Sequence, residues 1–329
     1  MSSYRRKLQL LISINLVLAL VISLGLVFSP ARSGKRAESR TILPDSETVA
    51  RISIEGVEAL ELVKSGTTWV LMEPGSISTS IPSNPSEASL PAEAARVRAF
   101  LGILSGIDRL ETVASGRSSW GALGLDDGQA NRLVLYDQNG TRLVALSVGT
   151  YDPTGSSSYL RIDPSETVYA GPSSLASYLS GGRRSWLDLR IWDRNFGASD
   201  VQSLVLRGGL DLPDGTRLDT DYRLTRSGAV WVADQSGVQL DTQKVDGMVR
   251  SILAARSEEY LEQDALDQPV LIISLGLGDG SSLELSISDG GAGDRFAALS
   301  SRRAHLLALS SWTIRDAVRP LAALLVQTP

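Results

Sequence analysis

The chain has 329 residues, of which 43% are hydrophobic and 21% are charged, a balance typical of globular proteins and not of disordered ones. This length predicts about two domains. The absence of cysteine excludes disulfides, thiolate metal sites and thiol nucleophiles. The net charge is −5, with +6 up to residue 40 and −11 in the remainder. An acidic body repels phosphate backbones, so we expect no binding to nucleic acid.

The first notable segment is Leu8–Phe28, which contains no charged residue. A helix of this length reaches about 30 Å, the thickness of a bilayer's hydrocarbon core. We therefore expect an N-terminal tail and transmembrane anchor over residues 1–30. A cleaved signal peptide is the alternative, since Ser29-Pro30-Ala31 supplies small residues.

The positive charges do not decide the orientation of this anchor, because basic residues lie on both sides of it. A short N-terminal tail followed by a large acidic body is typical of a signal anchor. We expect a single-pass protein of the inner (cytoplasmic) membrane, with its body facing the periplasm or the cell exterior.

Two segments in the first half of the chain each resemble a segment in the second half, in the same order along the chain. Val97–Leu104 matches Val245–Ile252 at an offset of 148, and Leu133–Gly149 matches Val270–Ser286 at an offset of 137. Such self-similarity indicates a copied supersecondary unit.

In the first copy, three short strands are expected at Val49–Ile54, Leu60–Lys64 and Thr67–Leu71, followed by a Ser- and Pro-rich loop. Next comes a helix with apolar residues at positions 97, 100, 101 and 104. Asn139-Gly140 then predicts a hairpin with a type I′ turn. A further strand pair and a short helix after Pro172 complete the copy.

The second copy repeats this order. A strand begins at Val201, and Asp241 is a suitable N-cap for a helix whose apolar residues are Val245, Met248, Val249 and Ile252. A strand pair then turns through Gly278-Asp279-Gly280.

These elements predict an α+β fold: an N-terminal transmembrane helix followed by two tandem copies of a mainly antiparallel sheet, with one principal packed helix each. The expected segments are the anchor over 1–30, a juxtamembrane linker over 31–48, the first copy over 49–182, a Trp- and Arg-rich junction over 183–200 and the second copy over 201–329.

The sequence contains no motif that specifies catalysis. His305 is the single histidine, no Gly-x-Ser-x-Gly elbow is present, and one histidine without cysteine does not supply the usual ligands of a zinc site. The glycine-rich Gly276–Gly280 lies between strands and is expected to be a turn. Acidic residues between Asp211 and Asp221 do not have EF-hand spacing. We expect no catalytic, metal or cofactor residues.

The junction between the copies is the one segment rich in residue types found at binding hot spots. Trp186, Arg190, Trp192 and Arg194 are therefore candidate interface residues. Either these side chains join the two halves, the preferred interpretation, or they contact an external partner.

The chain resembles the bacterial membrane-anchored family known as domain of unknown function 4340. The resemblance rests on the N-terminal apolar segment, the first three strands, Trp120–Asp126, Tyr159–Arg161, Val168-Tyr169 and Trp186–Arg190. Members of this family are encoded beside components of ABC-type transporters of the gliding-motility kind. The resemblance implies an extracytoplasmic accessory subunit without an established active site.

Three functions follow as hypotheses. The first is a membrane-anchored, non-enzymatic accessory or scaffold protein that contacts the bilayer through residues 8–28 and binds an ABC transporter permease, ATPase or envelope protein. The second is an envelope glycan-processing enzyme that uses paired carboxylates such as Asp126-Asp127 or Glu258-Glu259. The third is a module that binds a glycan or a peptide.

Overall fold

The computed structural model describes residues 37–39, 41–56, 58–73, 89–262, 265–289 and 294–326. The chain divides into two compact units. The first comprises the chain up to Ser89 together with Ala94–Ser185, and the second comprises Leu90–Glu93 together with the chain from Trp186 onward.

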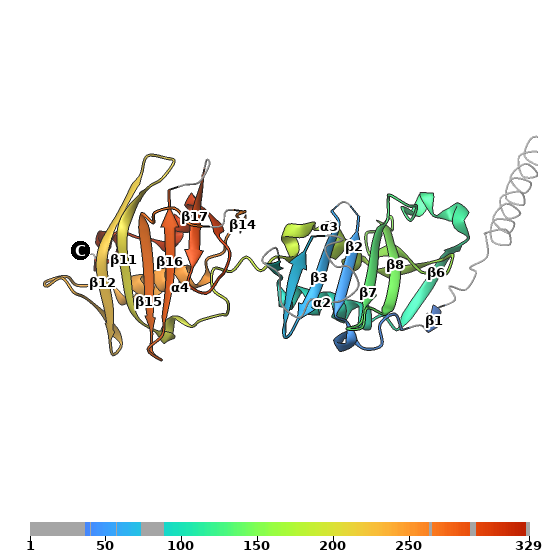
Figure 1. The fold of residues 1–329 in the computed structure, drawn as a ribbon, viewed down its shortest axis with the longest axis horizontal. Helices are drawn as coiled ribbons and strands as arrows, with labels where there is room; N and C mark the ends of the chain where they lie inside the picture. The colour runs from blue at the N-terminus through green and yellow to red at the C-terminus, as the bar shows by residue number, and fades with distance from the viewer. Residues whose placement is uncertain are drawn as a thin grey trace, which may run out of the picture. The chain divides into compact units, whose positions relative to one another are not determined.

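The first unit is built on an antiparallel sheet in the order β1-β6-β10-β9-β8-β7-β2-β3-β4 (Figure 1). Neighbouring strands along the chain form meanders. Successive side chains point to opposite faces of the sheet, which explains the alternating pattern of the sequence. The strands are β1 (Ala37–Ser39), β2 (Arg51–Glu55), β3 (Leu60–Ser65), β4 (Thr68–Met72), β6 (Arg109–Ser115), β7 (Asn131–Tyr136), β8 (Arg142–Tyr151), β9 (Ser157–Ile162) and β10 (Thr167–Pro172).

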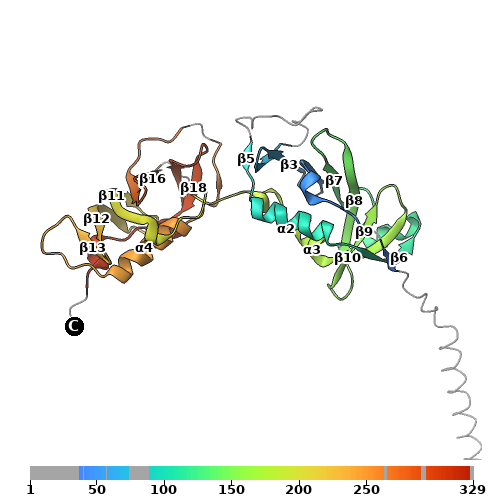
Figure 2. The ribbon, with the colours of Figure 1, turned by 90° about the horizontal axis from the view of Figure 1, so that it is seen from below.

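Two helices, α2 (Ala94–Ser105) and α3 (Ser173–Ser180), cover one face of this sheet (Figure 2). Helix α2 buries its apolar stripe of Val97, Phe100, Leu101 and Leu104. Because side chains alternate along a strand, the opposite face of the sheet carries the other half of the residues of each strand. Arg132 of β7 and Arg161 of β9, discussed below as part of a pocket, lie on this opposite face.

The second unit has an antiparallel sheet in the order β13-β12-β11-β15-β16-β17-β18-β14. Its strands are β11 (Val201–Asp211), β12 (Arg217–Ser227), β13 (Val230–Ala233), β14 (Glu259–Tyr260), β15 (Leu271–Leu277), β16 (Ser282–Ser288), β17 (Arg295–Ser300) and β18 (Leu307–Ser310). The helices are α4 (Thr242–Ala254) and α5 (Ser311–Ala317). Asp241 caps α4, as predicted, by accepting hydrogen bonds from the backbone N–H groups of Gln243 and Lys244.

Short segments complete the structure. Strand β5 (Leu90–Pro91) belongs to the second unit, in which Ala92 forms an isolated bridge with Leu187. The 3-10 helices are η1 (Ser46–Thr48), η2 (Arg117–Ser119), η3 (Gly121–Leu123), η4 (Arg183–Trp186), η5 (Ala198–Asp200) and η6 (Leu321–Leu324).

The two units share one topology. Reading from β4 in the first unit and from β13 in the second, the strands β4-β3-β2-β7-β8-β9-β10-β6 correspond one to one with β13-β12-β11-β15-β16-β17-β18-β14. The long helix follows the first meander in both units, and the short helix follows the last strand in both. The buried stripes of α2 and α4 correspond residue by residue at the offset of 148.

The strand registers correct the second sequence offset. Tyr136 pairs with Arg142 at the end of the first hairpin, and Gly276 pairs with Ser282 in the second, so these hairpins correspond at an offset of 140 and not 137. Beyond a register shift next to Tyr136, which β15 and β16 lack, β7 corresponds to β15 at an offset of 140 and β8 to β16 at an offset of 139.

The predicted type I′ turn at Asn139-Gly140 is also wrong. Only Gly140 has a positive φ, at 76°, and Asn139 does not. The carboxylate of Asp137 accepts hydrogen bonds from the N–H groups of Asn139 and Thr141, so the loop is longer than two residues and is closed by this side chain.

The expected fold class needs a correction. Both sheets are antiparallel, and among the described residues each unit has one long and one short α-helix, but the predicted transmembrane helix is not part of the fold that the structure describes. In the described part of the chain, no helix is long and apolar enough to cross a membrane. Helices α2 and α4 have 12 and 13 residues and bury one stripe each. Leu8–Phe28, to which we assigned the span, lies outside the described residues.

Candidate functional site

The aromatic residues of the junction lie inside the protein. Trp186 is 0% exposed and Trp192 is 1% exposed, and the indole N–H of Trp192 donates to the carbonyl of Ile252, 3.0 Å away. Trp192 belongs to the apolar core of the second unit. Arg194, in contrast, is exposed, with its guanidinium 4.8 Å from the centre of the Phe196 ring.

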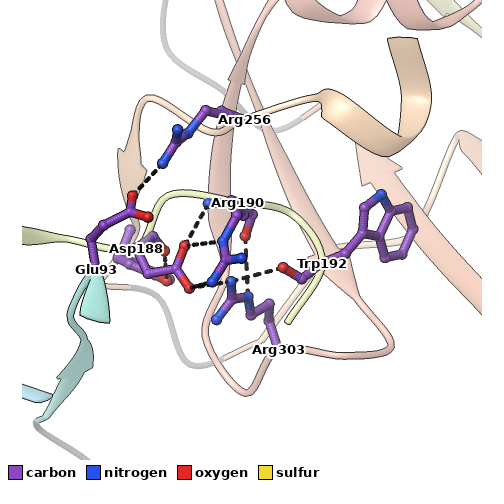
Figure 3. A network of polar contacts seen from close by, with 7 residues as sticks. Glu93, Asp188, Arg190, Trp192, Arg256 and Arg303 are labelled. Carbon is purple, nitrogen blue, oxygen red and sulfur yellow. Dashed lines mark hydrogen bonds and ion pairs between the residues drawn. The ribbon is translucent and has the colours of Figure 1, made fainter. Parts of the chain in front are cut away.

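Asp188 is the centre of a polar network within the second unit (Figure 3). Its carboxylate accepts two hydrogen bonds of 2.8 Å from Arg190 and one of 2.9 Å from Arg303. Arg303 also donates to the carbonyls of Arg190 and Trp192, at 3.1 and 3.0 Å. Figure 3 shows the indole of Trp192 pointing away from this cluster.

Arg190 and Arg303 stabilise the ionised form of the Asp188 carboxyl group. Burial alone would raise the pKa of Asp188, but the hydrogen bonds and charges of Arg190 and Arg303 outweigh it and hold the pKa below its usual range. The phenol of Tyr260 donates to the Asp188 carbonyl at 2.5 Å, and burial raises the pKa of Tyr260 to about 12.

Further contacts extend this network along the junction. Arg256 pairs with Glu93 at 2.6 Å, and Ser257 donates its N–H to the carbonyl of Leu189 at 2.8 Å. Of the four candidate residues, the structure thus gives Arg190 and Trp192 a role in holding residues 187–192 onto the second unit. Trp186 is buried, and only Arg194 is presented to solvent.

A second polar region, on the first unit, is an open cavity. Its volume is about 660 Å³, and its lining contains four arginines, four carboxylates and one tryptophan. We call it the arginine pocket and define it by Arg117, Trp120, Arg132, Arg142 and Arg161.

The floor of the arginine pocket is a row of residues that face one another across four strands. Glu55 of β2 pairs with Arg132 of β7, Arg132 pairs with Ser147 of β8, and Ser147 pairs with Arg161 of β9. Directly opposed residues share one face of a sheet, so their side chains meet above the strands.

Arg161 is the fixed member of this row. Its guanidinium donates to Asp163 at 2.6 Å and to Ser147 at 3.1 Å, and it lies 4.2 Å from the centre of the Trp120 ring. The Arg161 side chain is 12% exposed, and its Nε is buried without a hydrogen-bond partner in the described structure. Arg161 therefore forms the base against which Trp120 is positioned.

The roof of the arginine pocket is the segment that carries Trp120. The carbonyl of Trp120 accepts hydrogen bonds from the N–H groups of Leu123 and Leu125, and Gly124 closes the turn with a φ of 67°. Gly149 of β8 allows the close approach of this segment, because a Cβ at that position would lie 2.2 Å from the carbonyl oxygen of Leu123. A side chain at Gly149 would thus displace the roof.

The remaining arginines are loosely held. Arg117 is 76% exposed and lies 3.4 Å from Glu166, while Arg132 lies 3.7 Å from Glu55 and 3.8 Å from Asp163. Arg142 is exposed and has no ion pair in the part of the chain that the structure describes. Long, exposed ion pairs contribute little to stability, so these guanidinium groups are available to a ligand.

The second unit lacks this arrangement although its fold is the same. The row equivalent to Glu55, Arg132, Ser147 and Arg161 is Arg207, Ile272, Ser286 and Leu299. Ser282 stands in the position of Arg142. Because the second unit forms the same sheet without these arginines, the fold does not require them.

The other candidate groups have structural partners. Glu258 and Glu259 both pair with Arg295, and His305 lies edge-on against Tyr260 with the ring centres 5.7 Å apart. Asp211 and Asp219 both pair with Arg217. Within the described ranges, no group of three or more acidic or histidine residues gathers in a way that could hold a metal ion.

Sequence reasoning directed attention to the junction and missed the arginine pocket. Trp120 and Arg161 belong to segments that we used only for the family resemblance. The two copies differ at this site when they are compared in the strand register of the structure, which sets Arg132, Arg142 and Arg161 against Ile272, Ser282 and Leu299. The sequence offset of 137 does not align these positions.

The structure thus defines a duplicated, antiparallel α+β protein whose first unit carries the arginine pocket. The model of a family described as domain of unknown function (DUF4340) matches residues 83–270, more than half of the chain. The chain belongs to this family. No curated protein and no solved structure matches it.

Proposed function

We propose that the protein is a non-enzymatic accessory protein, attached to a bacterial membrane with its body outside the cytoplasm, that holds a partner protein through its first unit. The partner in this proposal is a component of an ABC-type transport system. Membrane attachment is supported by the uncharged segment over residues 8–28, and the kind of partner is supported by the family resemblance.

The observation that carries the proposal is the arginine pocket, which occurs on one copy of a duplicated fold. Both copies retain the apolar core, but only the first has Arg132, Arg142 and Arg161 on the same face of its sheet. A concave surface on which several polar groups converge is a candidate binding site. Duplication followed by divergence leaves one copy as support and the other as the binding unit.

The polar contacts favour binding over catalysis. Three of the pocket's carboxylates, Glu55, Asp163 and Glu166, each have an arginine as a neighbour, at 3.7, 2.6 and 3.4 Å. A glycoside hydrolase uses two carboxylates that flank the bond to be cleaved, and these ion pairs are the arrangement of a charged recognition surface. The ring of Trp120 already stacks on the guanidinium of Arg161, which makes it a poor platform for a sugar.

The test is purification of the tagged, full-length chain from membranes in a mild detergent after crosslinking. We expect an ATPase and a permease to be recovered with it, and we expect the chain to stay in the membrane fraction at high salt. Recovery of the chain alone, with and without crosslinking, would contradict the accessory role. Release of the intact chain by salt would contradict membrane attachment through residues 8–28.

A further inference from the structure

The arginine pocket has the dimensions of an extended peptide. Along β7, Arg132 lies four residues from Tyr136, which is the position opposite Arg142. At a rise of about 3.4 Å per residue, the two arginines are anchored about 14 Å apart along the strands. The cavity of about 660 Å³ that both line is large enough for a short segment of chain.

The charges of the pocket select the composition of such a segment. Arg117, Arg132 and Arg142 are exposed and loosely held or unpaired, so they can donate hydrogen bonds to the carboxylates of a ligand. The lining also contains Glu55, Asp127 and Glu166, which would repel a polymer of uniform negative charge. A ligand that carries both signs of charge satisfies all of these groups.

We propose that the arginine pocket binds an extended peptide segment of a partner protein, in which two acidic residues are spaced four apart and a basic residue lies between them. This inference rests on the proposed function, because it names the part of the partner that the first unit holds. In an extended chain, residues four apart lie on the same side and are separated by the distance between the anchors of Arg132 and Arg142. The intervening basic residue pairs with Glu55 or Glu166.

Fluorescence anisotropy of labelled synthetic peptides, with the full-length protein in detergent, tests this inference. The probe is a Ser/Gly peptide with two Asp residues spaced four apart and one Lys between them. The comparison peptides are a neutral Ser/Gly peptide and one in which the same charged residues are adjacent. Inorganic phosphate and dextran sulfate serve as competitors that represent a free anion and an anionic polysaccharide.

The decisive variant carries Arg132→Gln and Arg142→Gln, and its matched control is Arg98→Gln. Arg98 is exposed on α2, on the helix-covered side of the sheet, and has no ion pair in the described residues. Since Arg142 has no ion pair and those of Arg132 are long, we expect both variants to fold, as checked by circular dichroism. We expect the double variant to bind the spaced peptide about tenfold or more weakly and the control to bind it as the wild type does.

Equal binding by the wild type and the double variant would overturn the inference. So would equal binding of the spaced and adjacent peptides, or displacement by dextran sulfate or phosphate at concentrations as low as those of the spaced peptide itself. A chain that co-purifies with transporter components but binds no peptide would retain the proposed function and lose this inference. If the chain binds the spaced peptide but no partner is recovered with it from membranes, the proposed function is contradicted, whereas peptide binding by the arginine pocket is confirmed.

Discussion

The substitution Asp188→Asn tests the interpretation that the junction is a structural anchor of the second unit. It preserves the shape of the side chain but removes the charge that faces Arg190 and Arg303. The Arg303 side chain is 7% exposed and that of Asp188 is 6%, so the change leaves a guanidinium buried without its counter-ion. Breaking a buried pair in this way costs about 3–5 kcal/mol of unfolding free energy.

The size of the expected effect can be expressed as a melting temperature. For a unit of this size, a loss of about 1 kcal/mol lowers the melting temperature by about 2–4 °C, so a loss of about 3 kcal/mol lowers it by about 6–12 °C. Because the chain contains two units, differential scanning calorimetry should be combined with hydrogen exchange to assign each transition. We expect the loss in the second unit, with faster exchange over residues 187–192.

The matched control is Asp211→Asn, in the same unit. Asp211 pairs with Arg217 at 2.9 Å, but its side chain is 66% exposed, so we expect no resolvable change in melting temperature. If Asp188→Asn shifted the melting temperature no more than Asp211→Asn does, or shifted the transition of the first unit instead, the reasoning about the buried network would be refuted.

The contribution of the Asp188 carboxylate to the stability of the second unit depends on pH. The folded protein holds the pKa of Asp188 below the ordinary value of 3.8, so the unfolded chain takes up a proton first as the pH falls. The contribution of Asp188 to stability is therefore complete above the ordinary value and is lost below it. The melting temperature of Asp188→Asn should therefore fall less than that of the wild type as the pH is lowered through this range.

Three further predictions concern the second unit. Burial raises the pKa of Tyr260 to about 12 from a reference value of 10.0, so its contribution to stability is complete below pH 10 and is lost as the pH rises toward 12; Tyr260→Phe should reduce the fall in melting temperature over this interval. Trp192→Phe removes the hydrogen bond to the Ile252 carbonyl and should cost about 1–3 kcal/mol in urea unfolding. Asp246→Asn weakens the acceptor of hydrogen bonds from Arg226 and Trp231, at 2.5 and 2.8 Å, and should speed amide exchange in α4 and β13 but not in the first unit.

The helices could be predicted from the sequence because their patterns are local. The spacing of Val97, Phe100, Leu101 and Leu104 specifies one buried stripe, and Asp241 supplies the cap for the equivalent helix in the second copy. The hairpin at Asn139-Gly140 was also recognisable, but the turn type was not, since the carboxylate of Asp137 closes a longer loop.

The site could not be predicted in the same way, because it depends on strand register. Arg132 and Arg161 are far apart in the sequence, and only their common pairing with Ser147 brings them together. The junction illustrates the opposite error. Trp186 and Trp192 have the composition of a binding hot spot, but residue type alone does not distinguish a surface tryptophan from a buried one.

Crosslinking and recovery of partners from membranes, comparing the Arg132→Gln/Arg142→Gln variant with Arg98→Gln, test the central claim most directly. If the first unit holds the partner through the arginine pocket, the ATPase and permease should be recovered with the control as with the wild type, and lost with the double variant. Equal recovery with both variants, each folded and present at wild-type levels, would contradict the claim.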